Sequence, residues 1–427
     1  MKILTIVYNL EKGGTQRAAQ NFCEGYGELG HDSRILAAYG SGVRADELQQ
    51  KKIKVWVGLD EDVLNDIVQW CPDLVHIHSH EMNVKDIYNI KEVMVNTKFV
   101  ETNVFSTPSK YEDILEYSYQ LSNWCHFLYL ARGGSKQKST IVPYPVKTEA
   151  FFRSNKMDAI AFREKHGIPK DAFVFGRIGQ HYPGKWSLYL VDLFYKFIYE
   201  VDRNCYLLIV NPPHEIIKYI AKSNMNNIVI IDELIGDKEL RDCYSSMDLF
   251  LHIANQGESF GMVLAESILC GTPVITLSTP WADNTQCEVL GNSIGGMCAS
   301  TLNEFYTFMV ELFNDRNKLD KLGITGREYI INKYNYLLVA QKSIDVVSCT
   351  HPNKSILFDF SSIRKTNIHL RCISLILLKI KMNCIYFHRP INVMLRIIAR
   401  FNPIKGLRIN TYLKISWVKI VTAGGKK

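Results

Sequence analysis

The most constraining feature of the sequence is a repeated alternation between short apolar runs and longer segments with helical spacing. In the first third of the chain, the apolar runs cover residues 2–8, 33–38, 53–57, 74–78 and 98–101. Runs that are apolar on both faces are typical of parallel strands covered by helices on either side. The sequence therefore predicts a doubly wound, Rossmann-like α/β domain in this region.

A second set of apolar runs follows at residues 173–175, 206–210, 228–231, 249–252 and 274–277, with helices expected over 188–200, 238–245 and 262–270. Between the two sets, Val142-Pro-Tyr-Pro-Val146 carries two prolines and is expected to be a linker. We expect domains at 1–148 and 149–350. Two parallel-sheet domains in tandem are expected to face a ligand cleft at the carboxyl ends of their strands.

Charge divides the chain into an acidic body and a basic tail. Residues 351–427 contain 15 lysines and arginines and a single acid, whereas residues 1–350 carry a net charge of −7. After Pro390, apolar residues and arginines fall on opposite arcs of a helical wheel. We expect this extension to associate with an anionic membrane surface, the alternative being a helix packed on its own body with a solvated basic face.

Cysteine usage and hydropathy bear on the compartment. The 11 cysteines are odd in number and include no C-x-x-C pair, which predicts neither a disulfide framework nor a zinc finger. No apolar run approaches the ~18 residues that a membrane span needs. We therefore expect a cytoplasmic protein, peripheral on the inner face of the membrane.

The stretch richest in chemical information is Glu258-Ser-Phe-Gly-Met-Val-Leu-Ala-Glu266, followed by Cys270-Gly-Thr-Pro-Val-Ile275. A helix is expected to begin near Phe260 or Gly261, directly after a strand and its loop. The free N–H groups of a helix start bind anions, and the helix dipole adds to the attraction. A carboxylate beside such a site suits the hydroxyl groups of a sugar or a ribose.

This E-x7-E stretch with C-G-T-P-V-I resembles the signature of family-4 glycosyltransferases, similar to those of bacterial polysaccharide and O-antigen synthesis. The alternative is an unrelated α/β helix with two incidental glutamates. The resemblance implies a retaining, metal-independent enzyme of the GT-B fold. It further implies an acceptor-binding domain at 1–148 and a nucleotide-sugar domain at 149–350 whose last helix, about 336–347, crosses back. The basic extension at 351–427 lies beyond the resemblance.

The resemblance also implies roles for individual residues. Arg177 and Lys185 would clamp the nucleotide diphosphate, and together with Glu258 they are the expected catalytic residues. The alternative for Arg177 is a surface ion pair, and the alternative for Lys185 is a position in a solvated loop. Glu258 would contact the donor sugar and Glu266 the ribose. The implied donor-binding residues are Gly13, Gly14, Arg177, Lys185, Glu258, Ser259, Phe260, Gly261, Met262 and Glu266.

Two further positions are expected to reach the cleft on the acceptor side. His80 ends an apolar strand, and Asn103 stands where the family often has a histidine. His76, His78 and His80 alternate along a strand and are able in principle to hold zinc, but no carboxylate or cysteine shows a matching spacing. We expect His76 and His78 to be core residues with satisfied polar groups, and we expect no metal site.

Another acidic run, Asp60-Glu61-Asp62, has the literal D-x-D pattern of a metal motif but precedes a helical stretch, so helix capping is expected. The expected substrate is a UDP- or GDP-sugar, with no other cofactor, and the expected acceptor is a lipid-linked glycan or an oligosaccharide. Two alternatives stay open. One is a sugar-nucleotide epimerase on the same fold, and the other is a non-catalytic protein that binds nucleic acid through its tail. The tail lacks RNA-binding motifs, so we expect no nucleic-acid partner.

Overall fold

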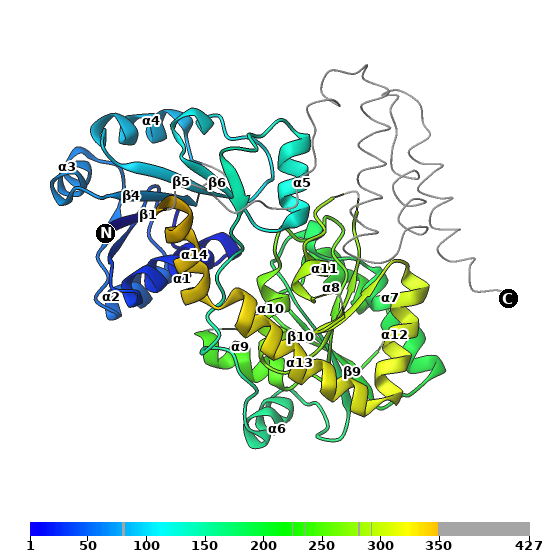
Figure 1. Cartoon of the computed structure of the whole chain (residues 1–427). Helices are drawn as coiled ribbons and strands as arrows, with labels where there is room; N and C mark the ends of the chain where they lie inside the picture. The colour runs from blue at the N-terminus through cyan, green and yellow to red at the C-terminus, as the bar shows by residue number, and fades with distance from the viewer. Residues whose placement is uncertain (79–81, 224, 235, 281, 292, 349–427) are drawn as a thin grey trace, which may run out of the picture. The chain divides into compact units, whose positions relative to one another are not determined.

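The chain forms two compact α/β units in a computed structural model. The structure describes residues 1–348 except 79–81, 224, 235, 281 and 292 (Figure 1). Within the described residues, the first unit comprises 1–147 with 333–348, and the second comprises 148–332. The predicted basic tail, 351–427, lies outside the described residues.

The first unit is built on a seven-stranded sheet in the order β3-β2-β1-β4-β5-β6-β7. Its strands are β1 (Lys2–Val7), β2 (Asp32–Ala37), β3 (Val55–Val57), β4 (Leu74–His78), β5 (Lys98–Asn103), β6 (Tyr117–Gln120) and β7 (Ser139–Ile141). Neighbouring strands pair in parallel throughout this sheet. The predicted doubly wound sheet is confirmed, but β6 and β7 were not predicted because they are short and mostly polar.

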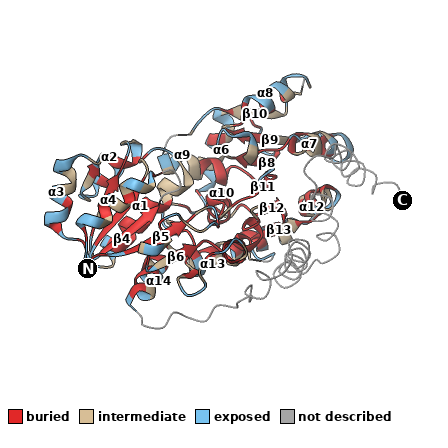
Figure 2. Cartoon of the chain, turned by 90° about the horizontal axis from the view of Figure 1, so that it is seen from above, coloured by how far each residue is buried: buried red, intermediate tan, exposed pale blue. Residues whose placement is uncertain are grey.

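Helices cover both faces of this sheet. They are α1 (Gly14–Glu28), α2 (Val43–Gln50), α3 (Glu61–Trp70), α4 (Val84–Val93), α5 (Asn123–Ala131) and α14 (Tyr336–Ser348), with a 3₁₀ turn at η1 (Glu112–Ile114). Along β1, Ile3 packs in one apolar cluster with Phe22 of α1, whereas Leu4 packs in another with Ile67 of α3. Successive strand residues thus face opposite layers, which explains the continuous apolar runs. Figure 2 shows β4 in red, the colour of buried residues.

A buried polar network ties α14 to this unit. The Tyr26 hydroxyl lies 2.7 Å from Ser343 Oγ and 2.9 Å from His76 Nδ1, and the Tyr119 hydroxyl donates to the Ser343 carbonyl at 3.0 Å. His76 is therefore a satisfied core residue. His78 is equally buried, but neither of its ring nitrogens has a hydrogen-bond partner, so the prediction of a satisfied His78 is wrong.

The acidic run at the start of α3 has the expected capping role. Asp60 is the N-cap residue, and its side chain accepts a hydrogen bond from the backbone N–H of Val63. Glu61 and Asp62 follow in the first turn, where negative charge offsets the helix dipole.

The second unit has a six-stranded parallel sheet in the order β10-β9-β8-β11-β12-β13. Its strands are β8 (Phe173–Ile178), β9 (Cys205–Val210), β10 (Ile228–Ile231), β11 (Leu249–His252), β12 (Val274–Leu277) and β13 (Gly296–Ala299). The helices are α6 (Lys156–Lys165), α7 (Tyr189–Glu200), α8 (His214–Ala221), α9 (Gly236–Ser245), α10 (Met262–Leu269), α11 (Gln286–Val289), α12 (Leu302–Asn314) and α13 (Arg316–Tyr334), with a 3₁₀ turn at η2 (Pro183–Lys185).

Two features of this unit were not predicted. Strand β13 has the sequence Gly-Met-Cys-Ala, which lacks a β-branched apolar run. A disulfide joins Cys287 of α11 to Cys298 of β13, although the cysteine pattern predicted no disulfide framework. Cysteine spacing could not reveal this pair, because only the fold brings α11 beside the edge strand.

The strand order creates a switch point between β8 and β11. From β8 the chain proceeds outward to β9 and β10, and from β11 it proceeds in the opposite direction to β12 and β13. The loops that leave the carboxyl ends of β8 and β11 therefore diverge, and ligands of open parallel sheets bind at such points. Both of these loops carry residues that the sequence analysis selected.

Helix α7 illustrates what holds this unit together. Its buried residues are Leu190, Val191, Phe194, Phe197 and Ile198, a spacing that forms one apolar stripe. Phe197 is fully buried and packs edge-on against Phe175 of β8, with ring centroids 4.9 Å apart. Tyr199, two residues further along, is 82% exposed.

We predict that Phe197→Ala lowers the free energy of unfolding of this unit by about 3–5 kcal/mol, because it opens a cavity against β8. The matched change Tyr199→Ala in the same helix should alter the free energy of unfolding by no more than about 0.5 kcal/mol. Urea unfolding monitored by circular dichroism measures both values. Equal losses in the two variants would contradict the assigned orientation of α7.

Candidate active site

The candidate site lies at the switch point of the second unit, in the loops after β8 and β11. Arg177 is the next-to-last residue of β8, and Lys185 ends the 3₁₀ turn η2 that follows. Glu258 lies in the loop between β11 and α10. The parallel pairing of β8 with β11 brings these loops together at one edge of the sheet.

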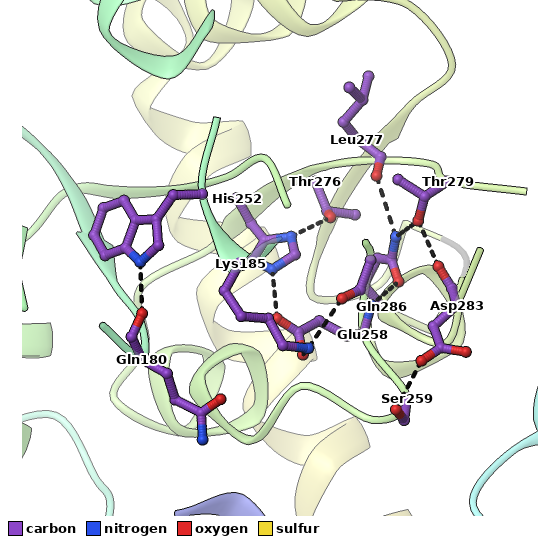
Figure 3. A network of polar contacts seen from close by, with 12 residues as sticks. Gln180, Lys185, His252, Glu258, Ser259, Thr276, Leu277, Thr279, Asp283 and Gln286 are labelled. Atoms are coloured by element: carbon purple, nitrogen blue, oxygen red, sulfur yellow. Dashed lines mark hydrogen bonds and ion pairs between the residues drawn. The ribbon is translucent and has the colours of Figure 1, made fainter. Parts of the chain in front are cut away.

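Glu258 is the centre of a polar network (Figure 3). Lys185 Nζ donates to Glu258 Oε2 at 2.7 Å and to the Gly257 carbonyl at 3.1 Å, and His252 Nε2 lies 3.2 Å from Glu258 Oε1. Burial raises the pKa of Glu258, but the charge of Lys185 and the bond to His252 outweigh burial and hold it well below its ordinary value. The side chain is therefore a carboxylate at neutral pH.

His252 ends β11 and is fully buried. Its Nδ1 lies 2.8 Å from the Thr276 hydroxyl on the neighbouring strand β12. Burial, together with the positive charge of Arg177, lowers the pKa of His252 to about 4, although Glu258 acts in the opposite direction. The imidazole is therefore neutral at neutral pH.

Arg177 is also fully buried, so the alternative of a surface ion pair is wrong. Its guanidinium donates to the Ile178 carbonyl at 2.8 Å and to the Lys185 carbonyl at 2.5 Å. It also lies 5.0 Å from the centroid of the Trp186 ring. Burial lowers the pKa of Arg177 to about 10, so it remains a cation that holds the loop carrying Lys185.

Backbone contacts fix the position of Glu258 from further directions. Its N–H donates to Gln286 Oε1 at 3.1 Å, and its carbonyl accepts from the Thr285 N–H at 3.1 Å. The Gln256 N–H donates to the Gly184 carbonyl at 3.0 Å, which joins the β11 loop to the β8 loop. The site is thus held by three segments that are far apart in the sequence.

The remaining donor-binding candidates surround the start of α10. Ser259 Oγ donates to Asp283 Oδ2 at 2.8 Å. Gly261 is the N-cap, with a φ of 93° that favours glycine, and Met262 is the first helical residue. Phe260 is 2% exposed, so only its backbone is suited to meet a ligand.

Glu266 lies inside α10 and is 4% exposed. The Tyr244 hydroxyl of α9 donates to Glu266 Oε2 at 3.1 Å. Helix α10 then ends as expected, because Gly271 follows the C-cap with a φ of +73° and its N–H donates to the Ile268 carbonyl.

Three predicted residues belong to the first unit. Gly13 is the N-cap of α1, and Gly14 is its first residue, directly after β1 and its loop. Asn103 ends β5 and is buried; its Nδ2 donates to Glu101 Oε1 at 3.1 Å and to the Thr107 carbonyl at 2.8 Å. His80 lies outside the described residues.

The sequence analysis did not select His252, Thr276 or Gln286. One available signal was that His252 is a polar residue at the carboxyl end of an otherwise apolar strand, where ligand sites of parallel sheets form. Gln286 carries no such signal, because its contact with Glu258 spans 28 residues.

In the part of the chain that the structure describes, no group of three or more histidine, cysteine, aspartate or glutamate side chains is arranged to hold a metal ion. None of the helices in this part is both long enough and apolar enough to span a bilayer.

Part of this unit matches a known protein family. Residues 158–298 match the family model described as glycosyl transferases group 1. The matched segment includes Arg177, Lys185, Glu258 and Glu266. An uncharacterized glycosyltransferase of Methanocaldococcus jannaschii is 27% identical over 144 residues, which cover 33% of this chain and 39% of that relative's length.

Solved structures resemble a larger part of the chain. HepE of Anabaena, in complex with UDP and glucose, matches with a TM-score of 0.68 at 16% identity, covering 82% of this chain and 99% of HepE. WaaG, a glycosyltransferase involved in lipopolysaccharide biosynthesis, matches with a TM-score of 0.55 at 13% identity, covering 81% of this chain and 99% of WaaG. These likenesses concern the fold, which is GT-B.

The loop before Glu258 offers a test of the site geometry. Gly257 has a φ of +67°, and a Cβ built on it would lie 1.9 Å from the Asp283 backbone oxygen. Gly167, in the same unit, has a φ of +70° but no atom within 4 Å of such a Cβ.

We predict that Gly167→Ala costs about 1–2 kcal/mol of stability, the cost of a left-handed backbone for a residue with a side chain. Gly257→Ala should cost clearly more, because the added methyl group also displaces the 279–286 loop. Urea unfolding of both variants measures the difference. Equal costs would mean that the contact between Gly257 and Asp283 does not restrict the loop.

Proposed function

We propose that this chain is a retaining, metal-independent glycosyltransferase that uses a UDP- or GDP-sugar as donor. Its acceptor would be a lipid-linked glycan or an oligosaccharide in cell-surface polysaccharide synthesis. The observation that carries the proposal is the ionised Glu258, paired with Lys185 at the switch point of a group 1 glycosyltransferase domain. The complex of HepE with UDP and glucose supports a UDP-sugar, and the biosynthetic role of WaaG supports a polysaccharide acceptor.

The charges of the site suit an anionic donor. Arg177 and Lys185 are cations and Glu258 is an anion, so with a neutral His252 the cluster carries one net positive charge. Lys185 has 22% of its side chain exposed and is able to turn toward a diphosphate, whereas Arg177 is buried and acts through its field and the loop it holds. Fixed cations stabilise the charge that develops on a departing diphosphate.

The roles of the other residues follow the same logic. Glu258 would accept hydrogen bonds from hydroxyl groups of the donor sugar, and Glu266, held by Tyr244, would bind the ribose. The N–H groups at the start of α10, around Ser259–Met262, would bind a phosphate. In the first unit, we propose donor-binding roles for Gly13 and Gly14 and acceptor-binding roles for His80 and Asn103.

In the proposed reaction, the acceptor hydroxyl attacks the anomeric carbon on the face from which the diphosphate leaves. A bond forms between the acceptor oxygen and that carbon, and the bond from carbon to the phosphate oxygen breaks. The diphosphate departs with the electron pair of that bond and takes the proton of the acceptor hydroxyl. The configuration at the carbon is retained without an enzymic nucleophile.

We predict that one of UDP, GDP, ADP and CDP raises the melting temperature of the protein well above the others, because a ligand that binds only the folded state stabilises it. The shift should be unchanged by EDTA. A thermal-shift screen with and without EDTA measures this. No shift with any nucleotide would contradict the proposed function, and a shift abolished by EDTA would contradict metal independence.

We predict that Glu258→Gln lowers turnover of the donor by ~100-fold, because the lost charge faces the sugar, while the bare nucleotide binds no more weakly than to the wild type, because Lys185 loses a competing partner. Glu266→Gln should instead weaken nucleotide binding by about tenfold or more, through loss of a charged hydrogen bond to the ribose. Calorimetry and product analysis by NMR separate the two effects. Near-normal behaviour of both variants would contradict the site assignment.

The same NMR experiment tests the alternative activity. A glycosyltransferase forms a new glycosidic bond only when an acceptor is present, and the product keeps the donor's anomeric configuration. An epimerase converts the donor alone to a new sugar nucleotide. The second outcome would replace the proposed transfer by epimerisation at the same site.

We further propose that residues 351–427 bind the inner face of the membrane, since their net charge of +14 suits an anionic surface. Deleting this segment should reduce sedimentation with vesicles that contain phosphatidylglycerol, whereas binding to neutral phosphatidylcholine vesicles should be weak for both proteins. Unchanged binding to the anionic vesicles after deletion would contradict this proposal.

A further inference from the structure

His252 and Thr276 lie beneath the candidate catalytic carboxylate, and the proposed function assigns them no role. We propose that His252, oriented by Thr276, is a positioning residue that holds the Glu258 carboxylate for the donor sugar. This inference rests on the proposed function, because it concerns the same site.

The hydrogen-bond pattern determines which ring nitrogen of His252 carries the hydrogen. Glu258 is ionised, so its Oε1 only accepts, and the ring nitrogen 3.2 Å away must be the donor. A neutral imidazole has one donor, so Nδ1 must accept, and the Thr276 hydroxyl at 2.8 Å must donate to it. The two hydrogen bonds thus run in one direction: Thr276 donates to His252, and His252 donates to Glu258.

The two partners of the carboxylate differ in how firmly they are held. The flexible side chain of Lys185 is partly exposed, and an anionic diphosphate competes with Glu258 for the Lys185 ammonium group. His252 is fully buried at the end of β11 and is fixed from β12 by Thr276. When Lys185 turns to a diphosphate, His252 is the partner that keeps Oε1 in place.

The neutral state of His252 also preserves the charge of Glu258. A protonated imidazole in the same place would be a third cation, beside Arg177 and Lys185, and would weaken the carboxylate as an acceptor for sugar hydroxyls. The groups that act electrostatically on His252 are Arg177, Lys185 and Glu258. Burial and Arg177 together keep the ring neutral, so the bond to Glu258 orients the carboxylate without neutralising it.

Five variants in the full-length protein test this role. His252→Leu removes both hydrogen bonds, whereas His252→Gln keeps an amide N–H that is able to reach Glu258. Thr276→Val removes the orienting hydroxyl with little change in volume, and Thr276→Ser retains it. As a control, His126→Gln changes a buried histidine of the other unit, whose Nε2 lies 3.0 Å from Ser139 Oγ.

The readouts are turnover of UDP-glucose and the other common UDP- and GDP-sugars, the dissociation constant for the bare nucleotide, and the melting temperature. We expect His252→Leu to lower kcat by ~10- to 100-fold, the range for partners that orient a functional group. Nucleotide affinity should stay within about threefold, since the variant leaves both Lys185 and the charge of Glu258 in place. Most of the kcat lost in His252→Leu should be recovered in His252→Gln. Likewise, most of the kcat lost in Thr276→Val should be recovered in Thr276→Ser. The control His126→Gln should leave kcat unchanged.

A purely structural role predicts a different pattern, in which kcat follows the melting temperature across all five variants and nucleotide affinity falls with it. That pattern, or normal kcat in both Thr276→Val and His252→Leu, would overturn the inference. If His252→Leu fails to fold, the comparison of Thr276→Val with Thr276→Ser decides. A wild-type protein that turns over no sugar nucleotide would instead contradict the proposed function itself.

A spectroscopic readout is independent of turnover. In nitrogen-15 NMR spectra, the signal of His252 is identified as the histidine signal that disappears in His252→Gln. At pH 7 this signal should be that of a neutral ring with hydrogen on Nε2. Thr276→Val should alter that signal. A ring with hydrogen on Nδ1, or a charged ring at pH 7, would overturn the inference whether or not the enzyme is active.

Discussion

The contact on which the second unit's site depends is the partly buried ion pair between Lys185 and Glu258. Taking charges out of water is costly, and the structure offsets that cost with a bond from His252 to the carboxylate and one from the Lys185 ammonium group to the Gly257 carbonyl. Gln286, at the start of α11, accepts from the backbone N–H of Glu258 and so holds the loop in place. These partners come from the end of β11, from the loops that follow β8 and β11, and from α11. The parallel sheet therefore serves as the frame that brings one carboxylate and its partners together.

Arg177 shows how burial changes the role that a sequence pattern indicates. Its resemblance to a diphosphate clamp implies direct contact, yet its guanidinium is buried against Trp186 and donates to two backbone carbonyls. A cation in that place still raises the local potential, keeps His252 neutral and supports the loop of Lys185. Its contribution to an anion site is thus electrostatic and conformational.

The fold was largely predictable because its determinants are local. Apolar runs such as β4 and β11 are continuous in sequence, and the helix predicted over 262–270, with its start near Gly261, matches α10. The short strands β6, β7 and β13 were not predicted, because segments of polar or small residues become strands only when a neighbouring strand supplies hydrogen bonds. The disulfide between Cys287 and Cys298 was not predicted for the same reason, because only the folded sheet places Cys298 beside Cys287.

The sequence by itself determined the two parallel α/β units, because hydrophobic periodicity is a property of neighbouring residues. Its motifs also singled out Arg177, Lys185, Glu258 and Glu266 as candidate site residues through a family resemblance. Only the tertiary structure decided which side chains surround Glu258 and in what protonation state. His252, Thr276 and Gln286 reach the site from separate strands and loops. Their burial and mutual distances set the charge of each group, and neither quantity exists before the chain is folded.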